Sequence, residues 1–385
     1  MTSGASDLLS LSLSFLLLAI IVLLYHAINS PRQGTMRYTR IMDRLRVLLI
    51  FGGESSEHEV SINSATNVLA ALDAARYDIN LCYIDRAGQW RLVETIETRN
   101  QPSPHLTPQL GQRSLLIDGV DPLPIDVIIP VLHGKNGEDG SVQGLAQLLH
   151  IPYVGPSLLS AAVTMDKDMT KRLALDAHVP VVPWRTLAND APRPTLAEIA
   201  DELGTPVFIK PSRAGSSVGV SKVHSAEAFT AALDEAFRHD DTVLIEQAIT
   251  ARELELAVLG RGTSARVSMP GEILPGEEFY SYDDKYSASS TSRVVIPAEV
   301  DESVATELQR LALAAYHATG GHGMARVDFF LDPTGQIFLN EINSIPGFTN
   351  ISMYPKLWEA SGLSPQALVD ELIKEALASH SICGV

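Results

Sequence analysis

The 385-residue sequence contains little cysteine and comparatively little positive charge. Its two cysteines, Cys82 and Cys383, lie far apart and lack the paired spacing of metal ligands, so neither a disulfide framework nor a zinc site is encoded. Such sparse cysteine fits a reducing compartment, and we expect a cytoplasmic protein. The chain has 29 Lys and Arg against 46 Asp and Glu, a formal net charge of −17, which repels nucleic acid phosphates. We therefore expect no nucleic acid partner.

Three common sequence templates are also missing. Gly260 and Gly262 lack the third glycine of a dinucleotide-binding fingerprint, no P-loop signature occurs, and Glu59 lacks the paired histidines of an HExxH zinc motif. At about 150 residues per domain, the length predicts roughly two to three domains. The chain is therefore large enough to build a sizeable core without disulfides.

One long hydrophobic run lies near the N-terminus. Residues 8–28 contain no formally charged side chain, and about 20 such residues could span a bilayer. Arginines from Arg32 to Arg46 follow it, which by the positive-inside rule would leave the rest of the chain in the cytoplasm, tethered to the inner membrane. A secretory signal is disfavoured because no positive charge precedes the run and no small-residue cleavage site closes it. The alternative is that translation begins at Met36 or Met42, so that residues 1–35 are an extension upstream of the true start.

The N-terminal part alternates strands with helices, which predicts an α/β domain with a mostly parallel sheet. Aliphatic runs at 46–51, 77–83 and 125–131 predict buried strands. The stretch between the last two, rich in Pro, Gln and Thr, predicts irregular surface. A helix is expected after the first strand, where Ser56 and Glu59 have the spacing of a capping box.

The C-terminal part is expected to add α+β character to the α/β fold. Apolar periodicity and turn residues predict the strands 207–210, 218–223 and 243–246 and the helices 169–175, 226–237 and 302–319.

The segment from Lys210 to Gly219, KPSRAGSSVG, has the composition of an anion-binding loop. Its small residues let backbone amides approach phosphate oxygens. Because a strand is expected on each side, the pattern predicts a hairpin flap instead of a loop that opens a helix. Lys210 ends an apolar strand, where a buried ammonium needs an anionic partner, and this favours a phosphate-binding loop over an ordinary flexible turn.

Two apolar runs near the C-terminus, joined by a Pro/Gly turn at 332–335, predict a β-hairpin. With a side-chain period of two, Arg326 and Asp328 share one face of the first strand, and Glu341 and Asn343 share one face of the second. If these faces coincide, carboxylate and amide oxygens converge, which is the ligand set that holds Mg²⁺ together with nucleotide phosphates. The alternative is a solvated hairpin face.

His133 and Glu59 are further candidates. His133 follows the predicted strand 125–131 at its carboxyl end, where the sites of open parallel sheets gather. The alternative is that His133 is a buried core residue with no role in binding or catalysis. Glu59 is either a functional carboxylate or the capping partner of Ser56.

Taken together, these motifs resemble the ATP-grasp superfamily and, within it, the D-alanine:D-alanine ligase family. The resemblance implies an N-terminal parallel-sheet domain followed by a two-subdomain ATP-grasp fold. The implied parts are an N-terminal extension (1–35), a substrate-binding α/β domain (42–155), a central subdomain (156–246) and a C-terminal subdomain with the metal site (247–385). The matching motifs are FGGESSEHEVS (51–61), HGKNGEDG (133–140), MDK (165–167), KPSRAGSSVG (210–219), EFYSYDDKY (278–286), RVD (326–328) and NEINSIPGFTN (340–350).

The resemblance implies a reaction in two steps. ATP phosphorylates the carboxylate of one D-alanine, and the amine of a second D-alanine attacks the acyl phosphate to give the dipeptide, ADP and phosphate. It also implies two Mg²⁺ or Mn²⁺ ions in each active site, a homodimer, and a role in supplying peptidoglycan precursors in a bacterium. Such chemistry depends more on positioning and charge neutralisation than on covalent catalysis.

The resemblance assigns roles around the two D-alanine molecules. Glu59 would bind the ammonium of the first D-alanine and hydrogen-bond with Ser216 and Tyr286. Arg326 would stabilise the tetrahedral oxyanion. The other substrate-binding residues would be His133 near the first carboxylate, Lys285 in a mobile loop, and Gly347 and Ser352 at the second D-alanine.

The resemblance likewise assigns nucleotide and metal contacts. The metal ligands would be Asp328, Glu341 and Asn343. The ATP contacts would be Lys167, Lys210, Ser217, Glu246, Gln247, Ala248, Ile249, Glu253 and Asn340.

Tyr286 bears on the choice of product. Family members that make the D-alanine:D-lactate depsipeptide lack this tyrosine, so the resemblance implies dipeptide synthesis here. Two other functions stay open: an ATP-grasp ligase that joins a different carboxylate and amine, and a membrane-tethered nucleotide-binding module without catalysis, motivated by residues 8–28. Magnesium-dependent ADP formation would separate the last of these from a ligase.

Overall fold

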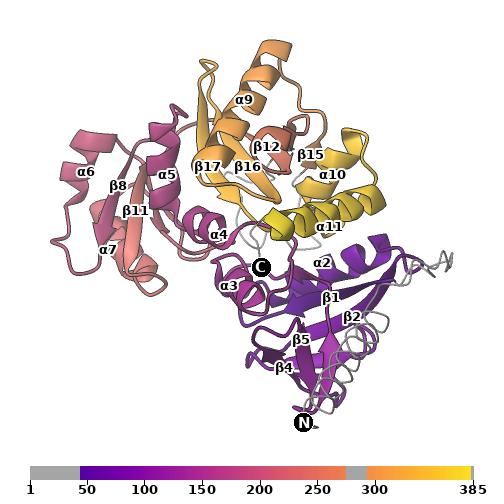
Figure 1. The fold of residues 1–385 in the computed structure, drawn as a ribbon. Helices are drawn as coiled ribbons and strands as arrows, with labels where there is room; N and C mark the ends of the chain where they lie inside the picture. The colour runs from indigo at the N-terminus through magenta and orange to yellow at the C-terminus, as the bar shows by residue number, and fades with distance from the viewer. Residues whose placement is uncertain (1–43, 275–292, 383–385) are drawn as a thin grey trace, which may run out of the picture. The chain divides into compact units, whose positions relative to one another are not determined.

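The computed structural model describes residues 44–274 and 293–382 (Figure 1). The hydrophobic run 8–28 and the residues Lys285 and Tyr286 lie outside this described part, so the expectations that rest on them stay predictions. Within the described part, no helix combines the length and the apolar character needed to cross a membrane. The chain from Arg44 onward forms one compact unit.

A four-stranded sheet in the order β3-β2-β1-β7 builds the N-terminal part. The strands β1 (Leu45–Gly52), β2 (Tyr77–Ile84) and β7 (Val127–Val131) are parallel, as predicted, and β3 (Trp90–Val93) pairs antiparallel at the edge. The carboxyl ends of β1 and β7 therefore lie side by side, and the loops that follow them start at the same edge of the sheet.

Helices α2 (His58–Ala71) and α3 (Ser141–Leu148) pack on the two faces of this sheet. Phe51 of β1 is buried with side chains of α2, whereas its neighbour Ile50 is buried with side chains of α3. This alternation explains the uninterrupted apolar run 47–51 of β1, because a strand covered on both faces has no solvent-facing side.

The segment between β3 and β7 forms a three-stranded antiparallel sheet, so the prediction of irregular surface is wrong. Its strands are β4 (Leu106–Gln109), β5 (Ser114–Ile117) and β6 (Asp121–Pro124). Each has only four residues, and prolines inside β4 and β6 hide the alternation that would reveal a strand. Leu115 is fully buried and joins this small sheet to the core.

A second four-stranded sheet, in the order β10-β9-β11-β8, is entirely antiparallel. The strand predicted at 218–223 is shorter than expected, because the amides of Val218 and Val220 make turn hydrogen bonds to Gly215 and Ser217 and Gly219 has a left-handed φ of 69°. The elements of this part are α4 (Leu158–Met165), α5 (Lys167–Asp176), β8 (Trp184–Ala188), α6 (Leu196–Leu203), β9 (Val207–Pro211), β10 (Ser221–Val223), α7 (Ala226–Ala236) and β11 (Thr242–Gln247).

A third antiparallel sheet, in the order β15-β14-β12-β16-β17, has β13 beside β12. Its β16–β17 pair is the predicted hairpin, in which Arg326 lies opposite Asn343 and Asp328 lies opposite Glu341. The elements of this part are β12 (Arg252–Leu259), the 3-10 turn η1 (Gly262–Ser264), β13 (Arg266–Val267), β14 (Gly271–Leu274), β15 (Arg293–Val295), α9 (Glu302–Ala318), β16 (Met324–Leu331), β17 (Ile337–Asn343), α10 (Met353–Ala360) and α11 (Pro365–Ile382).

The architecture confirms the predicted fold class, an N-terminal parallel sheet followed by antiparallel sheets of α+β character. One buried core contains Phe51 of the N-terminal sheet, Leu259 of β12 and Tyr354 of α10. Because this core spans the expected boundaries, the division into domains 42–155, 156–246 and 247–385 stays a prediction.

Gly52→Ala is expected to destabilise the protein, and Gly53→Ala is its matched control. Both glycines have left-handed φ angles, +95° and +97°, so alanine costs about 1–2 kcal/mol at either position. At Gly52 an added Cβ would also lie 2.2 Å from the Ile84 carbonyl oxygen, whereas at Gly53 the nearest atom would be 3.5 Å away. Urea unfolding should therefore show at least about 2 kcal/mol more loss for Gly52→Ala. Equal losses would contradict the close contact between the ends of β1 and β2.

Candidate active site

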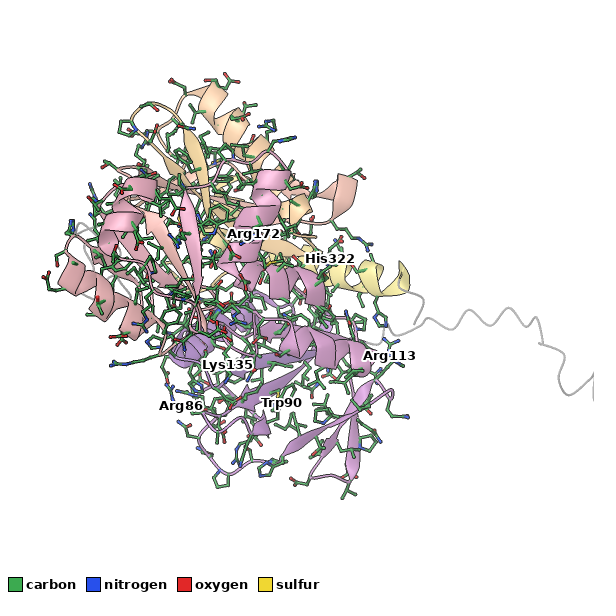
Figure 2. All side chains as sticks on the ribbon, turned by 90° about the vertical axis from the view of Figure 1, so that its left-hand side faces the viewer. Arg86, Trp90, Arg113, Lys135, Arg172 and His322 are labelled. Atoms are coloured by element: carbon green, nitrogen blue, oxygen red, sulfur yellow. The ribbon has the colours of Figure 1, made fainter. Side chains whose placement is uncertain are left out.

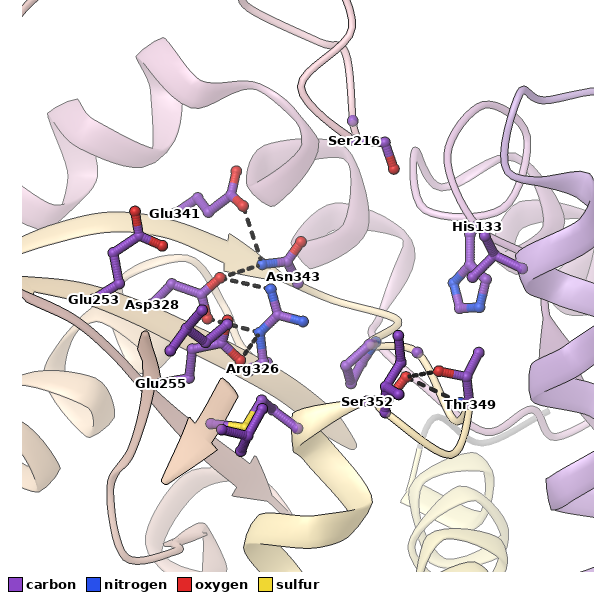
Figure 3. Close-up of a pocket in the computed structure, with 18 of the residues that line it drawn as sticks. His133, Ser216, Glu253, Glu255, Arg326, Asp328, Glu341, Asn343, Thr349 and Ser352 are labelled. Carbon is purple, nitrogen blue, oxygen red and sulfur yellow. Dashed lines mark hydrogen bonds and ion pairs between the residues drawn. The ribbon is translucent and has the colours of Figure 1, made fainter. Parts of the chain in front are cut away.

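A cavity of about 690 Å³ lies against β12, β16 and β17 and the loops around them (Figure 3). The predicted site residues that line it are His133, Ser216, Glu253, Arg326, Asp328, Asn340, Glu341, Asn343, Gly347 and Ser352. Those that do not line it are Glu59, Lys167, Lys210, Ser217, Glu246, Gln247, Ala248 and Ile249. The two faces of the predicted hairpin therefore coincide and face a cavity, and the solvated-face alternative is wrong.

Glu57, and not Glu59, is the glutamate at the cavity. Ser216 donates its hydroxyl proton to Oε1 of Glu57, which is only 8% exposed. The Glu59 side chain is 65% exposed and lies 3.3 Å from Arg86, which is labelled in Figure 2. The expected contact between Glu59 and Ser216 is therefore wrong. Each helical residue turns by about 100°, so two glutamates two positions apart at the start of α2 point to nearly opposite sides.

The start of α2 also differs from the predicted capping box. Glu57 occupies the N-cap position, and no side chain caps the helix there. Instead, the Ser55 hydroxyl donates to the carbonyl oxygen of His133 at 2.7 Å and accepts from the Glu57 amide at 3.2 Å. The loop after β1 is thereby fixed against the end of β7, with the Glu57 side chain directed at the cavity.

The loop 212–220 between β9 and β10, the glycine-serine loop, holds Ser216 against Glu57 in a strained conformation. Ser216 and Ser217 have φ angles of 49° and 58°, a region that costs a residue with a Cβ about 1–2 kcal/mol. The base of the loop is held by Asp240, whose Oδ2 accepts the Arg213 amide at 2.7 Å and whose Oδ1 lies 2.5 Å from the Arg213 guanidinium. This anchor and the bond to Glu57 oppose the strain.

His133 lies at the carboxyl end of β7, as predicted, but both of its ring nitrogens have protein partners. Nδ1 lies 3.1 Å from the carbonyl oxygen of Ile345, which can only accept, so Nδ1 carries the proton. Nε2 then accepts the hydroxyl proton of Ser64 at 3.1 Å. Burial lowers the pKa of His133, which favours this neutral form. In this arrangement no ring nitrogen of His133 is left for a substrate carboxylate, and the side chain shapes the wall of the cavity.

Glu138 is a cavity residue that the motifs did not single out, although it lies within HGKNGEDG. Its Oε2 accepts the Gly134 amide at 2.7 Å. Burial, and then the nearby Glu57 carboxylate, raise the pKa of Glu138 to about 8. Near neutral pH Glu138 is therefore protonated and adds no second negative charge beside Glu57.

Arg326 lies between two carboxylates, as Figure 3 shows. Its Nε is 2.9 Å from Oε2 of Glu255, and its Nη2 is 2.7 Å from Oδ2 of Asp328. Burial lowers the pKa of Arg326, but these two carboxylates outweigh it and hold the pKa well above its ordinary value. Glu255 was not predicted, although the alternation of β12 puts Glu253 and Glu255 on one face and the register sets Glu255 opposite Asp328.

The predicted metal ligands Asp328, Glu341 and Asn343 converge. The Asn343 amide nitrogen lies 2.9 Å from Oδ2 of Asp328 and 3.4 Å from Oε1 of Glu341. Over residues 44–274 and 293–382, no three acidic, His or Cys side chains form a ready-made metal cluster. Mg²⁺ in phosphate-binding sites, however, takes one or two carboxylates from the protein and completes its shell with phosphate oxygens and water. The donor set fits such an ion if Asn343 turns its amide oxygen toward it.

Four charged residues lie close together beside the cavity. They are Lys210 of β9, Glu246 of β11, and Lys167 and Lys171 of α5. The Nζ atoms of Lys210 and Lys171 lie 2.5 Å from Oε1 and 2.6 Å from Oε2 of Glu246. Burial alone would raise the pKa of Glu246, but the two ammonium groups lower it to about 2. Lys167 lies 3.8 Å from Glu341, which connects this cluster to the cavity. The motifs did not predict Lys171, although it follows Lys167 by four residues and so shares its helix face.

Backbone hydrogen bonds hold the end of β11 and the residue after it. The Gln247 amide donates to the Pro183 carbonyl at 3.0 Å, and the Ala248 amide donates to the Pro206 carbonyl at 3.1 Å. The N–H groups of these two predicted ATP contacts are therefore already bonded within the protein.

Gly347 and Ser352 lie together on the cavity wall, as predicted. The Ser352 hydroxyl is 2.8 Å from the Thr349 hydroxyl and accepts the Thr349 amide at 3.0 Å. A Cβ at Gly347 would lie 2.6 Å from the Ser352 hydroxyl oxygen. Glycine at this position therefore leaves the serine hydroxyl room to reach the cavity.

Known families and proteins match most of the chain. The family models described as D-ala D-ala ligase N-terminus and C-terminus match residues 46–156 and 173–374. The D-alanine–D-alanine ligase of Sodalis glossinidius is 51% identical over 351 residues, which cover 87% of this chain and 95% of that protein. The D-alanine–D-alanine ligase A of Escherichia coli K12 is 44% identical over 357 residues, which cover 88% and 98%.

Solved structures of ligases also match most of the chain. The D-alanine-D-alanine ligase from Coxiella burnetii has a TM-score of 0.80 and 38% identity, and the match covers 88% of this chain and 96% of that chain. VanG D-Ala:D-Ser ligase from Enterococcus faecalis has a TM-score of 0.79 and 35% identity, and the match covers 86% and 99%.

Glu138→Gln is expected to make folding stability less dependent on pH. The folded-state pKa of about 8 is above the unfolded value, so the contribution of Glu138 is present at low pH and is lost as pH rises through about 8. Glutamine still accepts from the Gly134 amide and cannot ionise. Urea unfolding without divalent ions should show the wild type losing at least about 1 kcal/mol more than the variant between about pH 6 and about pH 9. Parallel losses in the two proteins would contradict the raised pKa.

Proposed function

The chain belongs to the D-alanine–D-alanine ligase family, and we propose that it joins two D-alanine molecules in an ATP-dependent reaction that supplies the dipeptide for peptidoglycan. One observation carries this proposal. A single cavity combines a buried glutamate held by Ser216 with the cluster of Asp328, Glu341 and Asn343. The first group suits an amino acid ammonium, and the second suits metal-bound phosphates.

The proposed reaction has two steps. A carboxylate oxygen of the first D-alanine attacks the γ-phosphorus of ATP, the bond from that phosphorus to the β-phosphate oxygen breaks, and ADP leaves. The neutral amine of the second D-alanine then attacks the acyl carbon. Phosphate leaves with one of the original carboxylate oxygens, and the nitrogen loses a proton as the peptide bond forms. Both steps depend on alignment and charge neutralisation.

Glu57 is the proposed acceptor for the ammonium of the first D-alanine, in place of Glu59. Its carboxylate is buried and is oriented by the Ser216 hydroxyl. Because the neighbouring Glu138 is protonated near neutral pH, one ammonium neutralises the charge of this wall. An ion that binds there is thus fully compensated, as a buried charge must be.

Arg326 is proposed to stabilise the oxyanion that forms when the second amine attacks. Its guanidinium is fixed by Glu255 and Asp328 and cannot lose its proton, so it presents a preorganised positive charge. The Gly347 amide and the Ser352 hydroxyl are proposed to orient the second D-alanine. Their place on the cavity wall supports this role.

Asp328, Glu341 and Asn343 are proposed to hold two Mg²⁺ or Mn²⁺ ions. When bound, such ions would supply positive charge that neutralises the phosphates and disperses the charge of the transferring phosphoryl group. The remaining contacts to ATP are proposed for Lys167, Lys210, Ser217, Glu246, Gln247, Ala248, Ile249, Glu253 and Asn340.

The enzyme is proposed to act in the cytoplasm as a homodimer. The reaction consumes ATP, and the sparse cysteine usage suits a reducing compartment. The family resemblance alone supports the homodimer.

The direct test is phosphate release by the full chain with magnesium-ATP. D-alanine alone should sustain release and yield D-alanyl-D-alanine, whereas L-alanine should not. Because one solved relative is named a D-Ala:D-Ser ligase, mixtures of D-alanine with D-serine and with D-lactate belong in the same assay. A folded, ATP-binding protein that releases no phosphate with D-alanine would overturn the substrate assignment and would favour another ATP-grasp carboxylate-amine ligase.

Glu57→Gln is expected to weaken binding of the first D-alanine by about 10- to 100-fold, because a hydrogen bond between charged groups contributes about 1.5–3 kcal/mol. The KM for ATP should stay within about twofold. Glu59→Gln removes the same charge two residues away and should leave both KM values nearly unchanged. A larger effect from Glu59→Gln than from Glu57→Gln would restore the original assignment.

Asp328→Asn is expected to lower kcat at least about 100-fold, because it removes a charged oxygen ligand from the phosphoryl-transfer site. Asp332→Asn is the matched control, since Asp332 lies in the turn of the same hairpin and its Oδ1 accepts from Thr334 and Gln336 of that turn. Magnesium titrations of activity should shift to higher concentration for Asp328→Asn and should not shift for the control. Near-normal turnover in Asp328→Asn would remove Asp328 from the metal site.

A further inference from the structure

Lys171 of α5 is among the most completely buried charged side chains in the described part of the chain. Its side chain is 1% exposed, and its Nζ lies 2.6 Å from Oε2 of Glu246 and 3.2 Å from the Val182 carbonyl oxygen. The Trp184 ring centroid is 5.5 Å from the same Nζ. Burial lowers the pKa of Lys171, whereas the carboxylate, the carbonyl and the aromatic face favour the charged ammonium. Burying an ion costs free energy. A buried Lys171 next to the proposed nucleotide-binding residues is therefore expected to have a function.

Glu246 is shared between two lysines. Its second oxygen, Oε1, lies 2.5 Å from Nζ of Lys210, whose side chain is 14% exposed. The ammonium groups of Lys171 and Lys210 and the carboxylate of Glu246 together have a net charge of +1. Lys171 faces only the interior, whereas Lys210 stands on β9 immediately before the glycine-serine loop. The surplus positive charge can therefore be used only through Lys210.

Without Lys171, Glu246 and Lys210 would form a simple, neutral ion pair. An incoming phosphate would then have to compete with Glu246 for the Lys210 ammonium. With Lys171 in place, Glu246 keeps a cation partner when Lys210 turns to an anion. The difference is one unit charge in a buried setting, where electrostatic interactions are screened less than in water.

We propose that Lys171 is a positioning residue that neutralises Glu246 and thereby frees Lys210 to bind the phosphates of ATP. This inference rests on the proposed ATP-dependent function. It assigns Lys171 no contact with the nucleotide, because its ammonium is enclosed by Glu246, Val182 and Trp184.

The test is a double-mutant cycle on the full chain with Lys171→Met and Glu246→Gln. Methionine keeps most of the apolar stem on Trp184 and removes the charge. ADP binding is measured by calorimetry at several salt concentrations, and the KM for D-alanine is measured separately. In the wild-type background, Lys171→Met should weaken ADP binding at least about tenfold, flatten its salt dependence, and leave the KM for D-alanine within about twofold.

In the Glu246→Gln background, Lys171→Met should weaken ADP binding less than about threefold, because no carboxylate remains to sequester Lys210. A purely structural role would give the same loss in both backgrounds, and that result would overturn the proposal. So would unchanged ADP binding in Lys171→Met alone. Lys222→Met is the control, since Lys222 lies on neighbouring β10 over the Phe208 ring and should leave ADP binding unchanged.

If Lys171→Met does not fold, the proposal is tested with the double variant Lys171→Met/Glu246→Gln, in which neither residue is charged. ADP binding equal to that of Glu246→Gln alone supports the proposal, and a further tenfold loss overturns it.

Failure of the proposed function gives a different result. A wild-type protein that neither binds ADP nor releases phosphate refutes the ATP-dependent ligase, whereas a wild-type protein that does both leaves only the role of Lys171 to be decided.

Discussion

The hydrogen bond from Ser216 to Glu57 joins two loops whose residues are 159 positions apart in the sequence. Glu57 lies in the loop after β1, and Ser216 lies in the turn after β9. This contact therefore connects the parallel N-terminal sheet to the antiparallel central sheet. The left-handed angles of Ser216 and Ser217 show that the loop is held against its own backbone preference. The substrate side of the cavity depends on this contact, because it fixes the direction of the Glu57 carboxylate.

Charge compensation explains most of the remaining side chains. Arg326 is matched by Glu255 and Asp328, and Glu246 is matched by two lysines. Glu138 avoids a second negative charge beside Glu57 by keeping its proton. The charged side chains of the cavity are thus already oriented by their neighbours. They need little rearrangement when phosphates and ammonium groups bind.

The sequence predicts the hairpin of β16 and β17 well, because a period-two pattern and a tight turn define both register and face. It predicts the parallel N-terminal sheet because apolar runs alternate with a helical pattern there. It does not distinguish Glu57 from Glu59, since the choice depends on the residue at which α2 begins. Capping-box spacing sets the N-cap at Ser56, one residue before the observed N-cap, Glu57. The partners Glu255 and Lys171 are set by pairing between distant segments, which no local pattern contains. The small sheet from β4 to β6 is missed because its strands are short and interrupted by prolines.

The central claim is that one D-alanine carboxylate is activated by phosphorylation in this cavity. The most direct measurement supplies D-alanine labelled with ¹⁸O in its carboxylate, together with magnesium-ATP, and analyses the released phosphate by mass spectrometry. An acyl phosphate pathway predicts one ¹⁸O atom in each phosphate, in equal amount to ADP and D-alanyl-D-alanine. Unlabelled phosphate would contradict it, because water and not the amino acid would then have received the phosphoryl group.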